Sequence, residues 1–239
     1  MVEGVIVNEN IRDNNRGVTS HGVRTGYDRA LIEIKDGVLR MGALVEEQVR
    51  AALESLGNHD SRAASGVIEE DRRINELQQK TTALIAGAIA TQNPVARDLR
   101  YLLTLDHVSY ELERMGDHAA SVAKQSQRLA PLATLPEVAR VTELGLMVAD
   151  LVRGVTHALV DVDERAARQV AARDDEVDNR YRKLFESLLK TMRDDSSKVD
   201  AGTAILFAAH YLERIGDRVT NIAEDIVFLA SGEVEDLNP

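Results

Sequence analysis

Two pairs of carboxylates are the residues of this sequence best suited to do chemistry. Glu113 and Asp117 lie four positions apart, and Glu213 with Asp217 repeats the pair 100 positions later. On a helix, residues at this spacing point the same way, and like charges there repel each other by roughly 0.2–0.5 kcal/mol. A costly arrangement that occurs twice in register suggests a cation between the acids.

The two pairs belong to a longer internal repeat. Residues 112–117 read LERMGD and residues 212–217 read LERIGD. Such self-similarity indicates that the chain contains two copies of one structural unit. A glycine precedes each aspartate, Gly116 and Gly216, although glycine inside a helix costs roughly 0.5–1 kcal/mol relative to alanine. These glycines indicate either close helix packing or a bulky neighbour such as a metal cluster.

Further oxygen donors occur at related positions along the chain. In an antiparallel bundle, neighbouring helices would bring each upstream pair alongside its downstream pair, and four oxygen donors would suit Mg²⁺, Mn²⁺ or iron. The further candidate ligands are Asp71 and Asn75 for the first copy, and Asp174, Asp178, Asn221 and Glu224 or Asp225 for the second. The structural alternative is that all these acids form solvated helix faces, with Arg114 and Arg214 as local counter-charges.

Helical periodicity predicts the elements that must position these acids. Apolar residues recur every three or four positions from Tyr27 onward, as in amphipathic helices. Residues 1–26 lack this pattern, and we expect them to form a flexible N-terminal extension. The expected helices span about 28–57, 61–91, 94–129, 138–159, 163–193 and 198–230.

Cap signals set the expected helix starts. Asp60 or Ser61 can cap the second helix. Asn93 followed by Pro94 predicts the start of the third, with the asparagine as N-cap and the proline in the first helical position. Residues 196–197, both serine, are expected to cap the sixth helix.

Six long helices in two sets of three predict an all-α fold of two similar antiparallel three-helix bundles. The first bundle is expected over residues 27–131 and the second over residues 132–239. Aromatic residues make up only 3% of the chain and there are four prolines, which favours helices over a sheet.

Composition also excludes several classes of function. The chain has no cysteine, which rules out disulfides, thiolate metal sites and cysteine nucleophiles. The net charge of −11 argues against nucleic-acid binding. No apolar run approaches the length of a membrane span, about 20 residues, and no phosphate-binding loop or catalytic triad motif is visible. We therefore expect a cytoplasmic protein without catalytic machinery.

The segments around the paired acids resemble the PhoU family of phosphate-signalling proteins. The resemblance covers about residues 27–230 and rests on QNPVARDLR at 92–100, LERMGD at 112–117, LERIGD at 212–217 and NIAE at 221–224. It implies two three-helix bundles whose Glu/Asp-x-x-x-Asp motifs bind metal ions, iron or zinc, with manganese or magnesium as alternatives.

Carried over by position, the resemblance assigns metal binding to both acid pairs. These are Glu113 with Asp117 and Glu213 with Asp217, supported by Asp71 with Asn75 and by Asp174 with Asp178. Asn75 stands in place of an expected second acid, and Ser121 stands where the second copy has Asn221. Both departures weaken the first site relative to the second.

The resemblance further implies a negative regulator of phosphate uptake and phosphate-starvation signalling, not an enzyme. Such a protein would couple the ATPase of the phosphate ABC transporter to the sensor histidine kinase. It would act as a homodimer and reach the membrane only through these protein partners. A metal-free helical scaffold or docking protein is the alternative. A ferritin-like oxidase is disfavoured because no histidine has an acid three residues before it.

Overall fold

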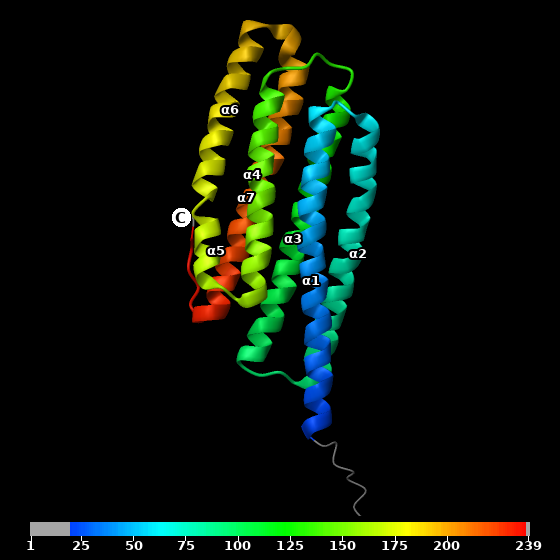
Figure 1. Ribbon diagram of the computed structural model, residues 1–239, viewed down its shortest axis with the longest axis vertical. Coiled ribbons are helices and arrows are strands. Elements are labelled where there is room, and N and C mark those ends of the chain that lie inside the picture. Colours follow the sequence, from blue (N-terminus) through cyan, green and yellow to red (C-terminus); the bar gives the residue numbers. More distant parts are fainter. Residues whose placement is uncertain (1–19, 238–239) are drawn as a thin grey trace, which may run out of the picture.

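The computed structural model describes residues 20–237, and these form helices joined by short connections (Figure 1). In chain order the elements are α1 (Ser20–Gly57), α2 (Ser61–Gln92), α3 (Arg97–Leu129), α4 (Glu137–Asp161), α5 (Glu164–Ala171), α6 (Asp174–Asp194), η1 (Ser196–Lys198) and α7 (Val199–Ser231). The described part of the chain contains no strand, so the expected all-α class is confirmed.

The helices form two matching sets that share one core. Helices α1, α2 and α3 make the first three-helix bundle, and α4, α5–α6 and α7 make the second. The bundles join through long packing of α3 on α7 and of α1 on α4, which leaves α2 outside on one flank and α5 and α6 outside on the other. Buried apolar residues from both sets belong to a single core cluster.

Two glycines allow α1 and α4 to approach each other closely. A Cβ added at Gly42 would lie 2.5 Å from Oγ1 of Thr156, and one added at Gly145 would lie 2.3 Å from Cδ2 of Leu53. Real Cβ atoms do not approach other heavy atoms so closely, because the interior is already densely packed. The crossing of the two bundles therefore depends on the absence of side chains at both positions.

The structure corrects two expectations in the first bundle. Helix α1 begins at Ser20, so residues 20–26, expected in the extension, are helical; residues 1–19 lie outside the described part of the chain. Asn93 is not the N-cap of α3 but the C-cap of α2, in the left-handed conformation with φ 51°. The following Pro94 disfavours the right-handed helical conformation at Asn93, which tolerates the left-handed one. Asp60 caps α2 as expected, accepting bonds from two backbone N–H groups.

The second bundle differs from expectation at two helix boundaries. The expected helix over 163–193 is divided into α5 and α6. The N–H of Arg173 donates to the carbonyl of Val170, three residues back. This tighter turn ends α5, and α6 begins at Asp174. The two serines do not cap the last helix: they lie in the single turn η1, which Asp195 caps by accepting from the N–H of Ser197, and α7 follows after Lys198 without a side-chain cap.

Candidate functional site

The first acidic cluster lies where α2 packs on α3. Asp71 accepts hydrogen bonds from Nε2 of Gln48 at 3.1 Å and from Nδ2 of Asn75 at 3.5 Å. A Cβ added at Gly116 would lie 3.0 Å from Oδ1 of Asp71. The missing side chain at Gly116 therefore makes room for the acid from the neighbouring helix.

The pKa values of Asp71 and Glu113 in this first cluster are raised, partly by the charges of neighbouring acids. Burial raises the pKa of Asp71, and the charge of Asp117 raises it further, against the bond from Gln48. Burial also raises the pKa of Glu113, followed by the charges of Asp117 and Asp71. Raised carboxyl pKa values mean that the charged forms are disfavoured in the fold, so a nearby cation would stabilise them.

The second cluster repeats this arrangement where α6 packs on α7. The side chain of Asp174 is buried and its Oδ2 accepts a bond from Oγ1 of Thr220 at 3.3 Å. A Cβ added at Gly216 would lie 2.8 Å from Oδ1 of Asp174. In both copies the glycine before the second acid of the motif thus faces a carboxylate from the helix upstream, which gives the repeated glycine a steric reason.

Glu213 is the most perturbed acid of the second cluster. Burial raises its pKa to about 7, and the charges of Asp217 and Asp178 add to the effect. This folded-state pKa lies above the ordinary value of 4.5, so the stability contributed by protonated Glu213 is complete at acid pH and is lost as pH rises through about 7. Burial likewise raises the pKa of Asp217.

A histidine and an arginine accompany the acids of the second cluster. Nδ1 of His210 lies 3.3 Å from Oε2 of Glu213, and Nη1 of Arg214 lies 3.2 Å from Oδ2 of Asp217. The Arg214 contact is the local counter-charge expected of a solvated helix face. His210 was not identified as a candidate from the sequence, although it precedes Glu213 by three positions, one helical turn.

Two further candidates, Asn221 and Glu224, make their hydrogen bonds elsewhere. Nδ2 of Asn221 donates to Oε2 of Glu111 at 3.3 Å, and Oε1 of Glu224 accepts from the N–H of Leu237 at 2.9 Å. Both nevertheless line the same open cleft as Asp174 and Asp217, with a volume of about 450 Å³. The other residues lining this second cleft are Arg214, Arg218, Thr220 and Asp236.

Sequence reasoning missed a set of polar contacts that joins the two repeats. Glu111 on α3 is only 5% exposed, and its Oε2 lies 3.4 Å from Nη1 of Arg218 on α7. Nearby, Nδ1 of His107 lies 2.6 Å from Oδ2 of Asp225. The sequence did contain a signal that Glu111 would be buried. It lies next to Leu112 and three residues after Val108, on the apolar face of its helix.

The clusters supply carboxylate oxygens, which hard cations prefer as ligands, but their side chains are not arranged as a coordination sphere. Across residues 20–237, no three histidine, aspartate or glutamate side chains are grouped so that they could hold a metal ion as they stand. Burial, with a smaller contribution from repulsion between neighbouring carboxylates, raises the pKa values of several of these acids. Cation binding would relieve this repulsion but requires the acids to change rotamers.

Fold and site define a class of helical protein with two homologous three-helix repeats, each presenting one acidic cluster. The PhoU domain family matches this chain at residues 38–126 and again at residues 141–226. The chain belongs to the PhoU family. No helix among the described residues is both long enough and apolar enough to cross a membrane.

Individual PhoU proteins also align with this chain over most of their length. The phosphate-specific transport system accessory protein PhoU homolog of Clostridium acetobutylicum is 36% identical over 213 residues, covering 89% of this chain and 97% of the relative. The homolog of the same name from Xylella fastidiosa is 36% identical over 214 residues, covering 90% and 89%. The crystal structure of PhoU from Pseudomonas aeruginosa superposes with a TM-score of 0.84 at 31% identity, covering 87% of this chain and 100% of that one.

Proposed function

We propose that this protein is a regulator of a phosphate-specific transport system. The match of both repeats to the PhoU domain carries the proposal, together with alignment over nearly the whole length of relatives that bear that name. In this role it acts in the cytoplasm as a homodimer and as a negative regulator of phosphate uptake and of phosphate-starvation genes. It couples the transporter's ATPase to the sensor histidine kinase, performs no catalysis, and reaches the membrane through these partners.

Loss of the protein is expected to raise the expression of phosphate-starvation genes in phosphate-rich medium. The measurement is a reporter driven by a phosphate-starvation promoter, in a deletion strain and in the strain complemented with the wild-type gene. Complementation should restore repression. Unchanged reporter activity in the deletion strain would contradict the proposed regulation.

We also propose that both acidic clusters bind metal ions, iron or zinc. Each cluster places three or more acids in one electrostatic field, and the raised pKa of Glu213 means that a cation would displace a proton there near neutral pH. The second cluster has more acids, because Asn75 in the first cluster takes the place that Asp178 has in the second. More anionic ligands give a more favourable Coulomb energy with the cation.

Asp217→Asn is therefore expected to lower the metal content of the purified protein more than Asp117→Asn. The measurement is elemental analysis after purification without chelator and without nickel affinity resin. Asp175→Asn, which changes an exposed acid on α6, is the matched control and should leave the metal content unchanged. Equal losses from the two cluster variants, or wild-type protein without metal, would contradict the ordering.

A metal-free docking scaffold is the second candidate function. The observation that favours it is the ion pair between Arg214 and Asp217, which neutralises one acid of the second cluster without a cation. In this case the acidic clusters would contact partner proteins directly. The same elemental analysis separates the two candidates, because the scaffold retains no metal.

A further inference from the structure

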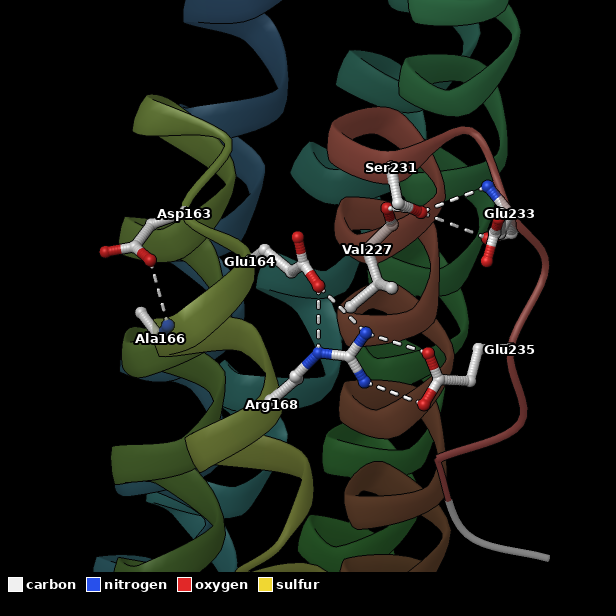
Figure 2. A network of polar contacts seen from close by, with 8 residues as sticks. All are labelled: Asp163, Glu164, Ala166, Arg168, Val227, Ser231, Glu233 and Glu235. Atoms are coloured by element: carbon white, nitrogen blue, oxygen red, sulfur yellow. Dashed lines mark hydrogen bonds and ion pairs between the residues drawn. The ribbon is translucent and has the colours of Figure 1, made fainter.

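The chain reverses direction after α7 and returns along the same helix. Gly232 ends α7 in the left-handed conformation, with φ 83°, and its N–H bonds to the carbonyl of Phe228. The N–H of Glu233 then donates to Oγ of Ser231 at 3.0 Å, which closes the turn (Figure 2). Residues 233–237, here named the strap, run back beside α7.

An arginine on α5 holds the strap in place. Nη1 and Nη2 of Arg168 each lie 2.8 Å from one carboxylate oxygen of Glu235, a two-point contact that suits the planar guanidinium (Figure 2). Nε of Arg168 donates to Glu164 at 3.0 Å, so the guanidinium is oriented by its own helix before it meets the strap. Arg168 therefore links α5 to the strap, and it is here named the latch.

The strap forms part of the wall of the second cleft. The N–H of Leu237 donates to Oε1 of Glu224 at 2.9 Å, and the side chain of Leu237 packs against the core. Between the two anchors, Asp236 lines the cleft together with Asp174 and Asp217. The strap thus reaches the acids of the second cluster and engages one of them.

Most contacts of the strap lie at the surface of the protein. Residues 233–236 are exposed, and the side chains of Arg168 and Glu235 are 36% and 48% exposed. Ion pairs at such exposure contribute little to stability and weaken with salt.

The first repeat has no equivalent of the strap. Asp71 corresponds to Asp174, and the same offset of 103 positions places Ser65 where the second repeat has Arg168. Ser65 is bonded to Gln127 of α3 and carries no charge. After α3 the chain continues into α4 instead of turning back.

We propose that the strap is a gate on the second cleft, with Arg168 as the residue that holds it closed, while the first acidic cluster has no such gate. Opening the strap frees Glu224 and widens the cleft beside Asp236. High salt, or an acidic peptide that competes for Arg168, promotes opening. The proposal bears on the proposed function because the gated cleft is the candidate metal cleft. The gate itself can be measured without any metal.

Thiol labelling tests the gate directly, because the chain has no cysteine of its own. Asn221→Cys places a thiol in the second cleft, and Ser121→Cys places one at the corresponding position of the first repeat. Adding Arg168→Ala is expected to speed maleimide labelling of the Asn221→Cys thiol by about two- to fivefold, the factor given by losing an exposed ion pair. The Ser121→Cys thiol should label at an unchanged rate.

Arg180→Ala is the matched control for the latch. Arg180 makes the same contacts with Glu176 on its own helix, 3.0 Å from Nε and 2.8 Å from Nη2, that Arg168 makes with Glu164, and has no contact with the strap. It should change neither labelling rate. Equal labelling of the Asn221→Cys thiol with and without Arg168→Ala would overturn the gate.

Amide hydrogen exchange gives a second test in the chain with its native residue at position 221. The exchange rate of the Leu237 amide should rise in Arg168→Ala by a similar factor and stay at the wild-type value in Arg180→Ala. Arg168→Lys, which keeps the charge but loses the two-point contact, should fall between Arg168→Ala and wild type. An unchanged Leu237 amide in Arg168→Ala would show that Arg168 is not the latch.

Discussion

Replacing Gly145 with alanine is expected to destabilise the protein by about 1–3 kcal/mol, the usual cost of overpacking a core. The new methyl group would lie 2.3 and 2.7 Å from the two terminal carbons of Leu53, whose side chain is only 2% exposed. Leu53 cannot move aside without displacing other core residues. This cost should outweigh the roughly 0.5–1 kcal/mol that alanine normally gains over glycine inside a helix.

Gly66→Ala is the matched control for this overpacking. Gly66 lies in α2, and a Cβ added there would meet no atom within 4 Å. Its substitution should therefore stabilise the protein by roughly 0.5–1 kcal/mol, the intrinsic helix preference alone. Urea denaturation would measure both changes in the free energy of unfolding. If both variants were more stable than wild type, the close crossing of α1 and α4 would be wrong.

Arg218→Met is expected to destabilise the protein by about 3 kcal/mol, because it removes the arginine beside the buried carboxylate of Glu111 and leaves only His107, 3.7 Å away, as a basic neighbour. Glu111 is 5% exposed and lies against Arg218 and Asn221 of the opposite repeat. The methionine preserves most of the apolar length of the arginine side chain. The loss therefore reports the uncompensated charge rather than lost packing.

Glu111→Gln in the same chain should recover most of this loss, since a neutral amide is less costly to bury than a lone charge. Arg73→Met serves as the control: its ion pair with Glu70 is shorter, 2.6 Å, but both side chains are 61% exposed. It should change the free energy of unfolding by less than about 1 kcal/mol. Similar losses from Arg218→Met and Arg73→Met would mean that burial of Glu111 is not the cause.

Local sequence signals were sufficient for most of the fold. The periodic apolar residues predicted the long helices because burial of one helix face dominates their stability. The cap at Asp60 could be predicted because a cap depends only on neighbouring residues. Asn93 shows the limit, since the same Asn-Pro pair is compatible with the start of one helix or the end of another.

The candidate site was less predictable because its contacts span long distances in sequence. The acid motif and its glycine indicated that Asp71 and Asp174 would lie beside the repeated helices, and both do. Nothing local could show that Asn221 would bond to Glu111, 110 positions away, or that Glu224 would hold the strap.

The packing of α3 on α7 also has an evolutionary consequence. The two repeats bury each other's central helix in one shared core. A half-length ancestor, with a single repeat, would have exposed a long apolar face to water and could hide it only by pairing with an identical copy. Duplication and fusion then made the partner permanent. Two halves on one chain need not remain identical, and only the second half has Arg168 and the strap that it contacts.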